Sequence, residues 1–147
     1  MNLPRYVLEA DESFMVYEFI SEGKKGKISK LIKFSEMDID GLFNLAFGDK
    51  GTDNEINDLV VTNNGDTDKV LATIIDSVYS FTARYPHSWV YATGSTRGRT
   101  RLYRMGITKY HQQAKKDFDL YGMLNKQWQK FNKGIEYEAF LVKRIIS

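Results

Sequence analysis

The chain has 147 residues, no cysteine and a formal net charge of +2. This length suits a single domain with its own hydrophobic core, and the missing cysteines exclude disulfides, thiolate zinc sites and cysteine nucleophiles. The two histidines are too few for a His-rich metal site, and the charge is far below that of a protein that coats DNA.

The amino-terminal residues lack the apolar stretch of a secretion signal, and no apolar run approaches the length of a membrane-spanning helix. We therefore expect a cytoplasmic protein with no membrane partner. We also expect one domain over residues 1–147, because no linker, repeat or low-complexity segment interrupts the chain.

The first half of the chain predicts mostly strands. Residues 14–21 and 27–35 are rich in β-branched and aromatic residues, and Glu22–Gly26 between them has glycine near both ends, which predicts a hairpin. In the second strand Lys30 shares one side with the apolar residues, so this strand is expected to be half-exposed. Tyr6–Glu9 is expected to add a short edge strand.

The next segment predicts a strand, a loop and a second strand. Leu42–Phe47 alternates apolar and small or polar residues, and Leu59–Thr62 is a short apolar run. Between them, Gly48–Asp58 is expected to be a polar loop. Its carboxylates do not fit the EF-hand spacing and no helix precedes them, so no metal site is predicted.

The clearest helix is predicted over Thr67–Arg84, where apolar residues recur at helical spacing and Pro86 follows as a stop signal. Asp66 or Thr67 is expected to cap it. The preceding Asn63–Asp66 segment has two interpretations. It is a turn that leads into the helix cap, or a set of catalytic polar residues at the end of a strand.

The second half predicts a strand at Ser88–Thr93, a loop at Gly94–Arg99 and a helix from about Thr100 to Phe118 with a kink at Gly106. Residues 128–131 are expected in a short helix or loop, and residues 136–145 in a buried strand. The order of elements predicts an α+β fold: a mainly antiparallel sheet of about five to six strands with two to three helices packed on it.

The most informative stretch is Gly94–Lys116, which holds seven basic residues and no acidic one. A strand that runs into Gly-Ser-Thr and then a helix leaves backbone N–H groups free to meet an anion, and arginines add bidentate recognition. It matches neither the P-loop nor the dinucleotide fingerprint. The predicted anion-binding residues are Ser95, Thr96, Arg97, Arg99, Arg101, Arg104 and Lys109.

The opposite charge gathers in residues 36–58, which hold seven acidic residues and one lysine. These acids either neutralise the basic segment inside the fold or form an acidic pole that docks a protein partner. Tyr103, Tyr110 and Tyr121 either stack on nucleic-acid bases or belong to the core.

The best function by this reasoning is an intracellular anion-binding domain without a cofactor, with nucleic acid or another phosphate-bearing ligand as its partner. One alternative is a phosphodiester- or phosphoryl-acting enzyme. In that enzyme Arg101 or Arg104 would stabilise developing charge, and His87 or Tyr103 would handle protons. The other alternative is a protein-interaction or self-assembly domain that uses residues 36–58.

Several long runs also carry a family resemblance: YEFISEGKKGKISKLIKF, NLAFGDKG, TNNGDTDKVLAT, YSFTARYP, GSTRGRTRLYRMGI and YEAFLVKR. Together they cover nearly the whole chain from Tyr17 to Arg144. The chain resembles a family of small bacterial proteins that is a domain of unknown function. That resemblance implies one compact domain, and it implies no activity, substrate or catalytic residue.

Overall fold

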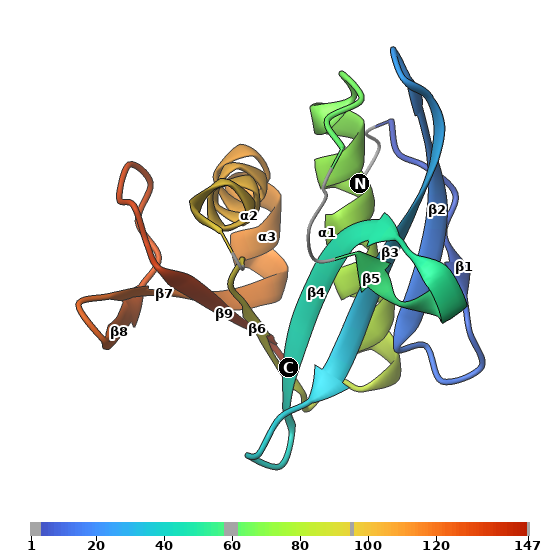
Figure 1. Cartoon of the computed structure of the whole chain (residues 1–147). Helices are drawn as coiled ribbons and strands as arrows, with labels where there is room; N and C mark the ends of the chain where they lie inside the picture. Colours follow the sequence, from blue (N-terminus) through green and yellow to red (C-terminus); the bar gives the residue numbers. More distant parts are fainter. Residues whose placement is uncertain (1–3, 58–61, 95, 147) are drawn as a thin grey trace.

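The computed structural model describes residues 4–57, 62–94 and 96–146 (Figure 1). In this part of the chain nine strands and three α-helices form an α+β fold. In chain order the elements are β1 (Glu9–Ala10), β2 (Val16–Gly23), β3 (Gly26–Glu36), β4 (Leu42–Lys50), a 3-10 turn (Thr52–Asn54), β5 (Ile56–Asn57), α1 (Thr67–Arg84), β6 (Trp89–Ala92), α2 (Arg97–Lys109), α3 (His111–Asp117), β7 (Phe118–Leu124), β8 (Gln127–Lys130) and β9 (Ala139–Arg144).

All described strands belong to one sheet, in the order β1-β2-β3-β4-β6-β9-β7-β8, with β5 paired to the end of β4. The neighbours are antiparallel except for β4 and β6, which are parallel. The α+β class is therefore confirmed, and the expected five to six strands are corrected to nine. Three strands were not predicted: β5, which is two residues long, β8, which is fully exposed, and β7, which starts where the helical pattern was expected to end. The first two lack a clear apolar alternation.

The amino-terminal hairpin forms where it was predicted, but its turn is shorter. Gly23 pairs with Gly26, so only Lys24 and Lys25 connect β2 to β3. The expected polar loop after Phe47 is also partly wrong, because β4 continues to Lys50 and Asp49 pairs with Asn57 of β5. Of the strand expected at residues 59–62, residues 59–61 lie outside the described part of the chain.

Helix α1 has the predicted bounds and forms the centre of the core. It connects the parallel strands β4 and β6, as such a crossover must. Phe81 is fully buried, and its ring stacks on Phe34 of β3 with the centroids 4.2 Å apart and meets Phe43 of β4 at 5.1 Å. Aromatic pairs of this kind add to the energy of burial, which fixes α1 on the β3–β4 part of the sheet.

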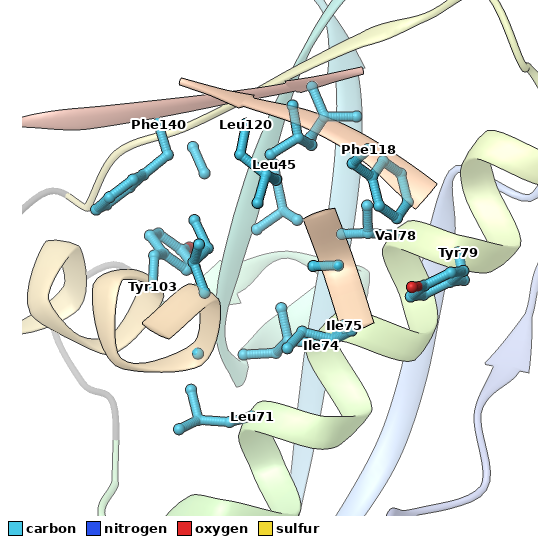
Figure 2. A pocket seen from close by; sticks show the side chains of 16 residues that line it. Leu45, Leu71, Ile74, Ile75, Val78, Tyr79, Tyr103, Phe118, Leu120 and Phe140 are labelled. Atoms are coloured by element: carbon cyan, nitrogen blue, oxygen red, sulfur yellow. The ribbon is translucent and has the colours of Figure 1, made fainter. Parts of the chain in front are cut away.

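Helices α2 and α3 lie beside the other half of the sheet (Figure 1). A cavity of about 80 Å³ lies between these two helices, α1 and the sheet. It is lined almost entirely by apolar side chains. Figure 2 shows Leu71, Ile74 and Ile75 of α1 and Tyr103 of α2 around it. Ligand pockets usually measure about 300–1,000 Å³, so we interpret this space as a packing gap.

Helix α2 begins at Arg97, earlier than expected, because Thr96 caps it by accepting a hydrogen bond from the Arg99 amide at 3.3 Å. No break occurs at Gly106, which is buried inside the helix. The helical direction changes instead at Tyr110, between α2 and α3. None of the helices in the described ranges is long and apolar enough to cross a membrane.

The Gly106→Ala variant tests this packing. A Cβ atom there would lie 3.3 Å from Leu71 Cδ2, the end of a flexible side chain that borders the cavity. Alanine is a better helix former than glycine, so we expect the free energy of unfolding in urea to rise by about 0.5–1 kcal/mol. Gly98→Ala is the control, because its Cβ would meet only the Thr96 hydroxyl, at 3.8 Å. A loss of stability confined to Gly106→Ala would show that the gap cannot accept a methyl group.

Candidate functional site

The basic segment divides onto two sides of the α2 amino terminus. Arg97, Arg101 and Arg104 lie along a groove of about 650 Å³, whereas Arg99 lines a separate pocket. We call the first the arginine groove; its residues are Thr93, Gly94, Thr96, Arg97, Gly98, Thr100, Arg101, Arg104 and Glu136–Glu138. Thr96 and Gly98 border both spaces, so the segment separates two different chemical environments.

Two arginines of the groove have no ion pair within the described residues. Arg97 and Arg101 are exposed, and their spacing of four places them on one face of α2. Arg104 is half-buried, and its Nη1 lies 3.3 Å from Oε1 of Glu136, which is 88% exposed. The groove therefore offers two guanidinium groups to a ligand and a third that Glu136 partly neutralises.

Arg99 faces β4 and β5 instead. Its Nη2 donates to the carbonyl oxygen of Asn57 at 3.3 Å and lies near Gly48. The close approach depends on Gly94, where a Cβ would lie 2.3 Å from Arg99 Cβ and 2.4 Å from the Thr100 amide. Only glycine at position 94 lets α2 start so close to the end of β6.

Of the remaining predicted residues, Lys109 is not brought to this groove. Ser95 lies outside the described residues. Lys109 is at the far end of α2, and its ammonium lies 2.7 Å from Oδ1 of Asp68, which ties α2 to α1. Their hydrogen bond raises the pKa of Lys109.

The aromatic and histidine candidates also lie elsewhere. Tyr103 and Tyr110 are buried, and burial raises the pKa of both hydroxyls, so neither ring is open to a base. Tyr121 is half-buried on β7. His87 is exposed in the turn before β6, at the opposite end of that strand from the arginines.

A second space, the polar pocket, has a volume of about 340 Å³. It lies where β4 runs on past the end of β6: Leu45 is opposite Ala92, the last residue of β6, while β4 continues to Lys50. The amino termini of α1 and α2 both border it. Ligands in open sheets bind at such carboxyl ends of parallel strands. Its residues are Lys30, Phe47, Thr62–Asn64, Asp66, Thr67, Val70, Thr96, Gly98, Arg99 and Leu102.

Asp66 occupies the cap position of α1, but its side chain makes no cap hydrogen bond. Oδ2 instead accepts from the Tyr6 hydroxyl and from the Ser21 hydroxyl, each at 2.5 Å. Burial and this bond to Asp66 raise the pKa of Tyr6. The predicted capping role is therefore wrong for the side chain, because it bonds to the hydroxyls of Tyr6, which precedes β1, and of Ser21 in β2 instead of to helix amides.

The side chain of Asn64 stabilises the turn that precedes Asp66. It is buried, its Nδ2 donates to Ser21 Oγ at 3.1 Å and to the Gly26 carbonyl at 2.9 Å, and its Oδ1 accepts from the Lys25 amide at 2.6 Å. All of its polar atoms hold the β2–β3 hairpin against this loop. Asn64 therefore braces one wall of the pocket.

Lys30 is only 1% exposed, although its strand was expected to be half-exposed. Its ammonium is paired with Oδ1 of Asp49 and donates to the Thr62 carbonyl at 2.8 Å. Burial opposes ionisation of Asp49, but hydrogen bonds from Lys30 and Thr62 outweigh it and lower the pKa of the carboxyl. The sequence signal was present, since Lys30 shares the apolar side of its strand, but its partner could not be inferred.

Within the described residues, two acidic residues of segment 36–58 form ion pairs, and both partners are lysines of β3. Asp49 pairs with Lys30, and Oε2 of Glu55 lies 3.5 Å from Nζ of Lys33. Among the described residues, no group of three or more His, Asp or Glu side chains could hold a metal ion. The charged residues that line the polar pocket are Lys30, Asp66 and Arg99, and each comes from a different part of the fold.

Residues 2–145 match a family of unknown function (DUF6934). The chain belongs to this family. No curated protein and no solved structure matches it significantly. This family assignment agrees with the resemblance seen in the long sequence runs.

The buried pair makes a stability prediction. Lys30→Met leaves Asp49 buried without its cation, so we expect a loss of about 3–5 kcal/mol in the free energy of unfolding, whereas Lys30→Met/Asp49→Asn should lose much less. Chemical denaturation at neutral pH measures both. A double variant as unstable as the single one would contradict the charge argument.

The same pair makes a pH prediction. Because the folded-state pKa of Asp49 is lowered, its stabilising effect is present above the ordinary aspartate pKa of about 3.9 and disappears as pH falls through the folded value. The double variant should therefore lose less stability than the parent on acidification below pH ~4. Equal acid sensitivity would contradict this.

Proposed function

We propose that this domain binds the phosphate backbone of a nucleic acid in the arginine groove. The observation that carries the proposal is the exposed pair Arg97 and Arg101, which share one face of α2 and have no carboxylate partner within the described residues. Guanidinium groups bind phosphate bidentately, and the adjoining helix amino terminus adds a positive potential.

An aromatic pair supports a single-stranded ligand. The rings of Tyr91 and Trp128 lie 6.1 Å apart, and Trp128 is 41% exposed. Val90 and Ala92 line the apolar cavity, so alternation along β6 directs Tyr91 to the opposite face of the sheet. Tyr91 is two residues from Thr93 of the groove, so a strand that leaves the groove could stack a base there.

Sequence reasoning selected other aromatic residues for this role. Its candidates were Tyr103, Tyr110 and Tyr121, whereas Tyr91 lies on a strand and Trp128 was expected in a short helix or loop. The alternation of Trp89, Val90, Tyr91 and Ala92 was a signal that two large rings share one sheet face. Only the pairing of β8 with β7 brings Trp128 to that face.

The carboxylates in the groove limit the affinity for nucleic acid that we expect. Glu136 neutralises Arg104, and Glu138 also lines the groove, where its Oε1 accepts from the Asn125 amide at 2.9 Å. Two phosphate contacts on a single strand predict a slope of about −1.4 for log Kobs against log salt. We therefore expect moderate binding that is clearest at low salt.

Fluorescence anisotropy with labelled single-stranded RNA and DNA across a salt series tests the groove. Arg97→Glu/Arg101→Glu should abolish binding at low salt, because it reverses both contacts. Lys115→Glu/Lys116→Glu is the matched control, since it makes the same charge change on exposed residues of α3 and should retain most of the affinity. If both variants lose the same affinity, the effect comes from net charge and not from this groove. If the parent protein does not bind at low salt, the proposal is refuted.

Trp128→Ala tests the stacking role. Loss of one stacked base costs about 1–3 kcal/mol, so we expect single-strand affinity to fall at least about fivefold while duplex affinity is little changed. Gln127→Ala, a change to an exposed neighbour in β8, is the control. Unchanged single-strand affinity in Trp128→Ala would remove the aromatic pair from the binding surface.

A further inference from the structure

The polar pocket differs from the groove in chemistry and does not depend on it. Its volume of about 340 Å³ falls within the usual range of small-molecule sites. We propose that it binds a small phosphorylated ligand that carries neighbouring hydroxyl groups, as nucleoside monophosphates and sugar phosphates do. This inference stands or falls separately from nucleic-acid binding in the groove.

The first support is the unused hydrogen-bonding capacity of Lys30. An ammonium has three N–H donors, and Lys30 uses two of them, toward Asp49 and the Thr62 carbonyl. The third donor has no acceptor within the described residues, and Nζ lies over the Phe47 ring, 5.8 Å from its centroid. Because Lys30 lines the pocket, a ligand anion there would accept from this third donor.

The second support is the meeting of two helix amino termini at this one space. The Asp66 side chain leaves α1 without a side-chain cap, and within the described residues the Thr96 hydroxyl accepts from one amide of α2, that of Arg99. The other amides of both first turns can therefore donate to a phosphate, and both helix dipoles favour negative charge there. Arg99 adds a guanidinium to the same wall.

The third support is Asp66, which gives the pocket an acceptor among these donors. Its Oδ2 accepts two hydrogen bonds, from Tyr6 and Ser21, whereas its Oδ1 has no hydrogen bond within the described residues. An ionised carboxylate oxygen accepts from hydroxyl groups, and this one is already held in place before a ligand arrives. A ligand whose phosphate meets these donors and whose hydroxyl groups meet Asp66 satisfies both ends of the pocket. Sugar phosphates and nucleotides share this pattern.

Isothermal titration calorimetry with the whole chain tests this. The probes are the four nucleoside 5′-monophosphates, ribose 5-phosphate, inorganic phosphate and 2′,3′-dideoxyadenosine 5′-monophosphate. We expect at least one ribose-bearing probe to bind with a Kd below about 1 mM, and inorganic phosphate and the dideoxy analogue to bind about tenfold more weakly. Equal affinity of ribose 5-phosphate and the nucleotides would identify a sugar-phosphate site, and tighter nucleotide binding would identify a nucleotide site.

Variants separate a ligand contact from a structural role. Asp66→Asn should weaken the ribose-bearing probes about tenfold while it leaves the weak binding of inorganic phosphate unchanged. Asp119→Asn is the matched control, because it makes the same change at an exposed residue of β7 outside this pocket and should keep the affinity. Thermal unfolding of each variant establishes that it is folded before titration.

Lys30→Met/Asp49→Asn tests the anion end, and we expect it to weaken inorganic phosphate and the ribose-bearing probes alike. Arg97→Glu/Arg101→Glu should bind the small probes as the parent does, which distinguishes this pocket from the groove. The proposal is overturned if no ribose-bearing probe binds with a Kd below about 1 mM, or if Asp66→Asn and the parent bind these probes with equal affinity.

Discussion

The parallel pairing of β4 with β6 is the constraint on which the rest of the molecule depends. Parallel neighbours need a crossover, and here the crossover is α1, whose burial against Phe34 and Phe43 forms the centre of the core. The same geometry sends the ends of both strands to one edge of the sheet. Since α2 begins directly after β6, two helix amino termini meet at that edge, beside the part of β4 that β6 does not cover.

This edge explains why the basic segment has two roles. A helix that starts beside a sheet presents one face to the sheet and another to solvent, so neighbouring arginines point to different environments. Arg99 lies against β4 and β5 in the polar pocket, while Arg97 and Arg101 lie along the exposed groove. Gly94 makes this possible, because any side chain there would collide with the start of α2.

Polar contacts between distant segments of the chain hold the pocket wall in place. Lys30 with Asp49, and Asp66 with Tyr6 and Ser21, each join segments that are far apart in the chain. Removing one partner of the buried Lys30–Asp49 pair costs several kcal/mol, so the fold requires these two residues to meet. These contacts hold the loop before α1 against β2, β3 and β4, and thereby place the first turn of α1 at the pocket.

The sequence by itself determined the fold class, the bounds of α1, the hairpin and the family resemblance, because local periodicity and turn residues encode them. It also identified the segment from Gly94 onward as the anion-binding candidate. Only the tertiary structure decided that Lys109 pairs with Asp68, that Tyr103 is buried, and that Asp66 meets Tyr6 and Ser21. Those facts depend on strand order and on contacts between residues that are distant in the chain, and no local pattern carries that information.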